Sequence, residues 1–211
     1  NGIMQIFPRH LNLLPLVIAG AATVGGGVLT GAIWYYAAPD NLQVGYAPEQ
    51  PVPYSHRLHA GELEMDCRYC HANVERSHEA MVPPTQTCMG CHTQVLPDSE
   101  RLAPVRESFE TGAPVEWVRV HQVPDTVFFD HSVHLAAGVG CVTCHGRVDQ
   151  MEVVQVDQPI SMGWCLDCHR DPGPGLRPRT EITNMDWAPD ENWVAHVDEV
   201  NPPTHCSGCH R

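Results

Sequence analysis

The sequence predicts a mainly α-helical and irregular fold with one N-terminal transmembrane helix. Three observations support this prediction: a long uncharged stretch near the N-terminus, ten cysteines that all fall in five short motifs, and a C-terminal region rich in proline. Short motifs need only short helices to carry them, and proline inside a helix removes a hydrogen bond and breaks it.

The N-terminal stretch predicts a membrane anchor over residues 1–38. No charged residue occurs from Leu11 to Ala38, a run longer than the roughly 20 residues that span a bilayer. Arg9 precedes the run and Asp40 follows it, so the positive-inside rule places the N-terminus in the cytoplasm. A cleavable signal peptide is the competing interpretation, but its apolar core is usually shorter, at about 7–15 residues. Residues 39–55 contain four prolines and predict an extended linker.

Every cysteine belongs to a Cys-x-x-Cys pair that is followed at once by histidine. This spacing is the signal for c-type haem attachment, because two thiols can reach two vinyl groups on one porphyrin edge and the histidine can ligate the iron. Zinc knuckles also use Cys-x-x-Cys, but zinc gives no reason for a histidine after every second cysteine. The sequence therefore predicts five covalently bound haems c, attached at Cys67 and Cys70, Cys88 and Cys91, Cys141 and Cys144, Cys165 and Cys168, and Cys206 and Cys209, with proximal ligands His71, His92, His145, His169 and His210.

An internal repeat divides the region after the linker. A His-x-x-His pair, His56 and His59, precedes the first two motifs, and a second pair, His131 and His134, precedes the next two. This pattern predicts a first dihaem module over 54–97, a spacer with little periodicity over 98–120, a second dihaem module over 121–171 and an irregular tail with the fifth haem over 172–211. The modules resemble small multihaem cytochromes of the c3 and c7 type. About 170 residues for five haems leave little room for a side-chain core, so we expect the haems to fill the interior.

Histidines outside the five motifs are the candidates for the sixth iron ligands. His-x-x-His on a helix places both imidazoles on one face, where each can serve a different haem. We therefore expect the distal ligands to come from His56, His59, His121, His131 and His134. Met151 and Met162 lie between the third and fourth motifs, and a Met/His haem has a higher potential than a bis-histidine haem. The alternative for each methionine is core packing.

The chain carries 12 basic and 25 acidic residues, and every basic residue is arginine. A formal net charge of −13 argues against nucleic acid as a partner, because phosphate binding needs a basic surface. Arginine can pair with haem propionates, but the sequence does not indicate which of the arginines does so. The absence of lysine excludes a catalytic site of the Cys-x-x-Cys-Lys type, and we expect no catalytic residues in this chain.

With these features the chain resembles the pentahaem cytochrome c subunit of alternative complex III, a bacterial quinol-oxidising complex. The anchor, the five motifs, the stretch from Tyr54 to His59, the stretch 120–131 and the stretch 161–170 carry the resemblance. It implies a respiratory membrane complex with an iron–sulfur subunit, a monohaem cytochrome c and polytopic quinone-binding subunits. It also implies electron transport from quinol through iron–sulfur clusters into these haems, and onward to a cytochrome c or a terminal oxidase.

Two functions therefore compete for this sequence. The first is an electron-transfer subunit whose haem region lies outside the bacterial cytoplasmic membrane, where haem attachment takes place. The second is a self-contained membrane-anchored multihaem quinol dehydrogenase, which needs a proton acceptor for quinol near the membrane. Around the linker only Asp40 and Glu49 could serve as that acceptor, so the sequence favours the first function.

Overall fold

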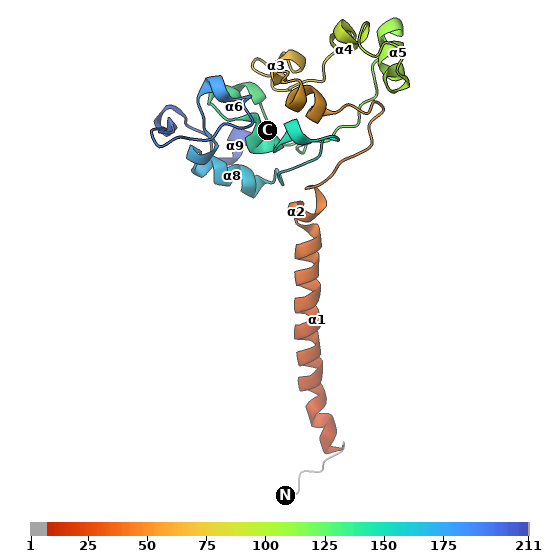
Figure 1. Cartoon of the computed structure of the whole chain (residues 1–211). Helices are drawn as coiled ribbons and strands as arrows, with labels where there is room; N and C mark the ends of the chain where they lie inside the picture. Colours follow the sequence, from red (N-terminus) through yellow and green to blue (C-terminus); the bar gives the residue numbers. More distant parts are fainter. Residues whose placement is uncertain (1–7, 211) are drawn as a thin grey trace, which may run out of the picture. The chain divides into compact units, whose positions relative to one another are not determined.

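The computed structural model describes residues 8–210, except the side chains of residues 39 and 40, and divides the chain into a unit ending at Leu42 and a unit starting at Gln43. The first unit is the long helix α1 (Leu14–Ala37), which follows a 3-10 turn, η1 (Arg9–Leu13) (Figure 1). Pro15 stands in the first turn of α1, where proline is tolerated because no internal partner exists for its nitrogen. Together, Arg9–Ala37 form one helix that is long and apolar enough to cross a membrane.

Residues 39–42 differ from the predicted linker. The sequence predicts an extended chain from residue 39, but the backbone forms one further helical turn, α2 (Pro39–Leu42). Proline at the first position of a helix removes no internal hydrogen bond, so Pro39 starts this turn rather than preventing it. Between α2 and the turn η2, which begins at Arg57, no further helix is named.

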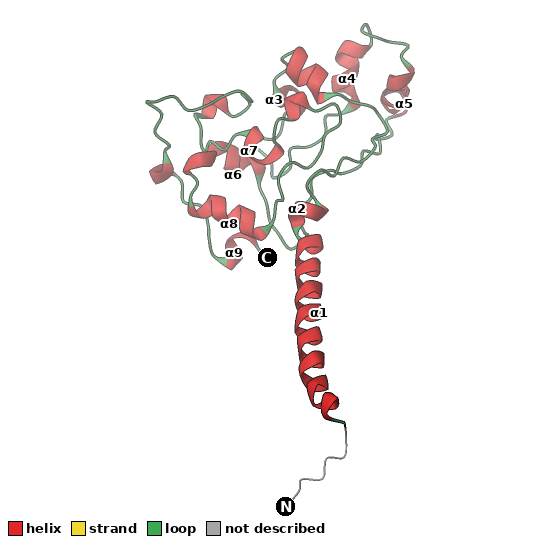
Figure 2. Cartoon of the chain, turned by 60° about the horizontal axis from the view of Figure 1, so that its bottom comes forward, coloured by secondary structure: helices red, strands yellow, loops and turns green. Residues whose placement is uncertain are grey.

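The second unit consists of short helices joined by irregular chain, as predicted, and its described residues form no named strand, only the isolated bridges Val127–His210 and Val139–Leu176 (Figure 2). The five motifs occupy five of the helices: α3 (Cys67–Cys70), α4 (Thr85–His92), α7 (Cys141–His145), α8 (Met162–Arg170) and α9 (Cys206–Cys209). The remaining elements are η2 (Arg57–Glu62), η3 (Glu100–Leu102), α5 (Ala103–Thr111), α6 (His131–Ala136), η4 (Val148–Gln150), η5 (Gly173–Gly175), η6 (Arg179–Glu181) and η7 (Val197–Glu199).

Side-chain caps explain where several of these short helices begin. The carboxylate of Asp66 accepts a hydrogen bond from the backbone of Arg68 at the start of α3. Asp130 caps α6 in the same way, and the hydroxyl of Ser161 caps α8. Each cap satisfies a backbone N–H that the helix itself leaves without a partner. Local sequence therefore fixes the first turn of three elements that carry, or lie next to, histidine ligand candidates.

The spacer contains a helix that the sequence analysis did not predict. Residues 103–111 form α5, whose Val105 side chain is buried beside Val52 and Met89 of α4. Figure 1 and Figure 2 both show α4 and α5 side by side. Gly112 ends the helix with a φ of +76°, a left-handed conformation that glycine adopts without steric cost. The helix is nine residues long, too short for an apolar period to stand out against the surrounding prolines.

The side-chain core of the second unit is small. Seven apolar side chains are buried in the described part of the chain: Val52, Met89, Val105, Leu135, Val156, Leu176 and Ile182. A soluble unit of this length normally buries many more apolar side chains, because the buried fraction of its surface rises with size. The small core therefore agrees with the expectation that large apolar groups other than side chains fill the interior.

Candidate haem attachment sites

All ten cysteines are free thiols, and each motif places its two thiols on one helical turn. None of them forms a disulfide, so every pair remains available for two thioether bonds to one macrocycle. The histidine that follows each pair lies at the end of the same turn or directly after it. This local geometry is what covalent haem attachment requires, and the chain has five such attachment sites.

Backbone carbonyls orient four of the five motif histidines. The Nδ1–H groups of His71 and His92 donate to the carbonyls of Met81 at 2.6 Å and Val95 at 2.8 Å. His169 donates from Nδ1 to Pro203 at 2.7 Å, and His210 donates to Thr126 at 3.2 Å. A carbonyl can only accept, so Nδ1 carries the proton and Nε2 keeps its lone pair for a metal. Such bonds to the outer nitrogen fix the ring orientation of a metal-bound histidine.

The His-x-x-His pairs have the same internal geometry in both modules. Tyr54 stacks on His59 with ring centroids 4.5 Å apart, and Phe129 stacks on His134 at 4.6 Å. The same aromatic rings meet His56 and His131 edge-on, at 4.9 Å and 4.8 Å. The repeat predicted from the sequence is therefore a structural repeat, although its helical type differs: the second pair lies on α6, whereas the first lies on the π-helical turn η2 and the residue before it.

One residue of each repeat orients the second histidine through its carbonyl. The Nδ1–H of His59 donates to the carbonyl of Ser55 at 2.9 Å, and that of His134 donates to the carbonyl of Asp130 at 2.7 Å. Sequence reasoning missed these orienting residues and the stacked aromatic rings. The signal that reveals them is the repeat itself, since an aromatic residue stands two positions before the first histidine in both copies.

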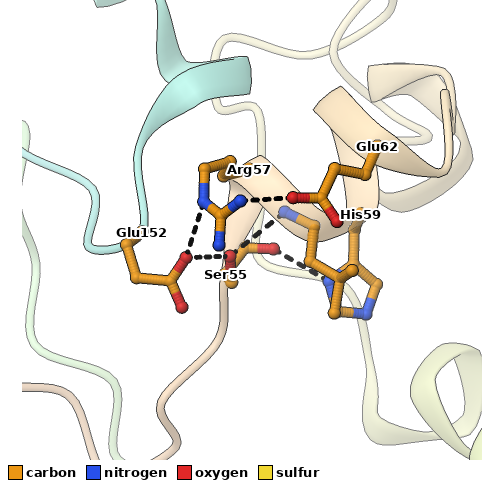
Figure 3. A network of polar contacts seen from close by, with 6 residues as sticks. Ser55, Arg57, His59, Glu62 and Glu152 are labelled. Atoms are coloured by element: carbon orange, nitrogen blue, oxygen red, sulfur yellow. Dashed lines mark hydrogen bonds and ion pairs between the residues drawn. The ribbon is translucent and has the colours of Figure 1, made fainter.

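A polar network holds Ser55 in place (Figure 3). The buried Ser55 hydroxyl donates to the carboxylate of Glu152 at 2.8 Å and accepts from the backbone of Leu58 at 3.1 Å. Arg57 also donates to Glu152, at 3.1 Å, and forms a second ion pair with Glu62. Glu152 belongs to the segment after η4, so this network ties the first histidine pair to the second half of the chain (Figure 3).

Three pairs of imidazoles lie at the separation that one iron between them requires. With a metal–nitrogen bond of about 2 Å and a nitrogen about 1.2 Å from its ring centroid, two axial imidazoles have centroids roughly 6.3 Å apart. His59 and His92 are 6.3 Å apart, His131 and His145 are 6.4 Å apart, and His134 and His169 are 6.1 Å apart. In both copies of the repeat the second histidine thus faces the histidine of the second motif that follows: His59 faces His92, and His134 faces His169.

The other candidates occupy less defined positions. The Nδ1 of His56 and the Nε2 of His121 are buried without a hydrogen-bond partner. Burial, together with the neighbouring imidazoles of His71 and His59, lowers the pKa of His56 to about 4. His121 lies against His145, with ring centroids 4.5 Å apart, which is too close for one iron between them. The side chain of Met162 is 66% exposed, and Met151 is half-buried.

Burial keeps the central imidazoles neutral. Burial first, and then the neighbouring His121 and His131, lower the pKa of His145 to about 3. The pKa values of His121 and His134 are lowered too, again mainly by burial. A neutral imidazole is the form that ligates a metal, so proton competition for these nitrogens is weak at neutral pH.

Contacts between motifs define their order in space. Interaction with the neighbouring thiol of Cys141 lowers the pKa of Cys67, so the first motif lies beside the third. Tyr54 lies beside the thiols of the first and second motifs: burial raises its pKa, and Cys70 and Cys88 raise it further. Burial, together with the thiols of Cys168 and Cys165, raises the pKa of Cys144 to about 12. Gly175 lies against both the Cys168 thiol and the Thr143 side chain, which places the third motif beside the fourth.

The tail completes this series of contacts. The carbonyl of Pro203 accepts the hydrogen bond of His169, and the side chain of Pro203 packs over Gly208 between the last two cysteines. The fourth motif therefore touches the fifth. The segment 182–183 also joins the first motif to the third. The backbone N–H of Cys141 donates to the carbonyl of Ile182 at 3.0 Å, and the hydroxyl of Thr183 donates to the carboxylate of Asp66 at 3.0 Å. The motifs thus form one series in the order second, first, third, fourth and fifth.

Comparisons with known proteins agree with these sites. The family model "Cytochrome c7 and related cytochrome c" matches residues 127–211. The protein "Menaquinone reductase, multiheme cytochrome c subunit" from Nitratidesulfovibrio vulgaris (strain Hildenborough) is 34% identical over 128 residues, which cover 60% of this chain and 59% of that protein. The match thus spans less than two thirds of that relative. Together with the five attachment sites, these similarities make the chain a multihaem cytochrome c whose C-terminal part is similar to cytochrome c7.

Proposed function

We propose that this chain is the electron-transfer subunit of a membrane complex that exchanges electrons with a quinone pool. The observation that carries the proposal is the unbroken series of contacts that links all five attachment sites. Bound haem supplies one-electron oxidation and reduction, and the protein sets potentials through ligands and burial. A series of neighbouring sites with two ends suits transport between two partners, whereas a catalytic haem needs an iron with an open position.

The imidazole pairs support an assignment of the sixth ligands. We assign His59 to the second motif, His131 to the third and His134 to the fourth, because each lies at the axial separation from the histidine of that motif. The structural repeat supports the assignment of His56 to the first motif, since it matches His131 in the second module. For the fifth motif, His121, Met151 and Met162 stay the candidates from the sequence, although His121 lies against His145 of the third motif.

The partners follow from the resemblance and the relative together. The relative is named as a subunit of a menaquinone reductase, and the resemblance to alternative complex III implies quinol oxidation. Both point to a quinone-linked complex, although the direction of electron flow differs between them. We propose an iron–sulfur subunit, a monohaem cytochrome c and polytopic quinone-binding subunits as neighbours, and a cytochrome c or a terminal oxidase as the electron acceptor. Helix α1 is the proposed anchor, with its N-terminus cytoplasmic and the haem region on the opposite side.

The test compares the purified chain with its native membrane complex. A menaquinol analogue is added to each, and reduction of the haem α-band is followed in a stopped-flow instrument. Dithionite, added afterwards, measures the full reducible haem in both samples and shows that the isolated chain keeps its haems. We expect quinol to reduce the haems in the complex and not in the isolated chain. If the isolated chain reduces as fast as the complex, it has its own quinol site, and the self-contained dehydrogenase is the correct function.

A further inference from the structure

The third attachment site lies against a buried arginine. Arg177 is 6% exposed, and it is the one charged residue that is buried in the described part of the chain. Its backbone N–H donates to the carbonyl of Gly138 at 2.9 Å, just before the third motif. A Cβ atom at Gly140 would overlap the Arg177 side chain, so glycine next to Cys141 makes room for it.

The Arg177 side chain has little to neutralise its charge. Its Nη1 donates to the carbonyl of Asn184 at 2.9 Å, and its Cζ lies 5.1 Å from the ring centroid of Trp187. Its Nε is buried without a hydrogen-bond partner, and no carboxylate in the described chain lies within ion-pair distance of it. A buried charge without a partner is costly, and chains retain one mainly where it has a use. Arginine keeps its charge even so, because its pKa lies far above neutral pH.

Two groups near Arg177 could offset its charge, the Cys141 sulfur and the Glu181 carboxylate. Burial lowers the pKa of Arg177, while the thiol of Cys141 and the carboxylate of Glu181 act in the opposite direction. Once Cys141 is a thioether it carries no charge, so only Glu181 remains as a counter-charge. Glu181 is half-buried, and its carboxylate already accepts a hydrogen bond from the Asn184 side chain. The propionates of a haem lie on the edge opposite its thioether bonds, away from Cys141.

We propose that Arg177 sets the reduction potential of the haem attached at Cys141 and Cys144 by holding an unneutralised positive charge against its thioether edge. Reduction adds an electron, so a nearby cation favours the reduced state and raises the potential. This inference rests on the proposed electron-transfer function. The charge of Arg177 makes the haem at the third site, the middle of the series, easier to reduce than its ligands alone imply. A unit charge in a partly buried setting changes such an equilibrium by roughly tenfold.

The experiment is a spectroelectrochemical titration of the α-band in the full haem-loaded chain. We expect R177Q to lower the reduction equilibrium constant of one of the five haems about tenfold, which equals about 59 mV for one electron. R177K keeps the charge and should leave that haem near its original potential. R179Q is the matched control, because Arg179 is two residues away, exposed and paired with Glu199 at 3.8 Å. It should change none of the five components.

A second variant keeps the proposal testable if R177Q does not accumulate with haem. E181Q removes the remaining counter-charge from a half-buried position, and it should raise the potential of the same haem that R177Q lowers. The proposal is overturned if R177Q and E181Q leave all five potentials unchanged, or if R177K shifts the potential as much as R177Q. The haem count of each variant is measured by intact mass. Fewer than five haems in the unmodified chain would contradict the five-site assignment itself, whereas unchanged potentials with five haems would contradict only the role of Arg177.

Discussion

The imidazole pairs make a quantitative prediction for alanine variants of the second histidine pair. His134 faces His169 at 6.1 Å, and His131 faces His145 at 6.4 Å, and we propose on this basis that the two side chains serve different motifs. Replacing His134 by alanine therefore removes one axial ligand from one haem in five. We expect one fifth of the haem to change from low spin to high spin in this variant, and another fifth in the His131 variant. The double variant should show two fifths, because the two losses are independent.

Electron paramagnetic resonance and visible spectra of the purified chain measure these fractions. His196→Ala is a suitable control, because the Nε2 of His196 donates to the carbonyl of Ala137 at 2.9 Å and is not available to a metal. That variant should stay fully low spin. The reasoning is refuted if the His134 variant stays fully low spin. It is also refuted if the double variant contains no more high-spin haem than either single variant, since both histidines would then act on the same haem.

Three further predictions concern stability and local order. Ser55→Ala loses the hydrogen bonds to Glu152 and Leu58, so the free energy of unfolding in denaturant should fall by about 1–2 kcal/mol. Because His59 is then held less firmly, one site should gain high-spin haem. An unchanged denaturation midpoint would contradict the network of Figure 3. Gly112→Ala places a side chain at a φ of +76° and should destabilise the chain by about 1 kcal/mol, whereas Gly173→Ala, where a Cβ atom would make only ordinary contacts and φ is not positive, should not reproduce this loss. Hydrogen bonds from Arg68 lower the pKa of Asp66 to about 2 from its ordinary 3.8. The contribution of Asp66 to the free energy of unfolding is therefore full above pH 4 and is lost as the pH falls towards 2. The stabilities of the unmodified chain and Asp66→Asn should converge over that interval, and a constant difference would contradict the assignment.

The sequence was sufficient for the attachment sites because covalent chemistry fixes their spacing. Cys-x-x-Cys-His is a local pattern, and a local pattern can be recognised in the sequence without any knowledge of tertiary contacts. The same holds for the apolar helix over Leu14–Ala37 and for the proline-rich tail, in which the described residues form only 3-10 turns and the motif helix α9. The His-x-x-His repeat was visible in the sequence too, and the structure gives both copies the same aromatic stacking.

Features that depend on contacts between distant residues were not predictable. Helix α5 is stabilised by packing of Val105 against Val52 and Met89, which lie 53 and 16 positions before it in the sequence. The order of the motifs depends on the contact of Cys67 with Cys141 and on the path of segment 182–183 between them. No local pattern distinguishes Arg177 from the exposed arginines, because its burial comes from the tail folding over the third motif. The boundaries of the two dihaem modules stay a prediction, since residues from Gln43 onward form one compact unit.

The positions of the five irons decide whether the attachment sites form one series. Electron cryomicroscopy of the haem-loaded complex, or anomalous scattering from crystals of the chain, locates each iron beside its motif. Our account predicts five irons in one series, with neighbours in the order second, first, third, fourth and fifth motif, and with the irons at His92 and His210 at the two ends. An iron at His92 that lies next to the fourth or fifth motif, or a motif whose iron has no neighbour in the series, would contradict it.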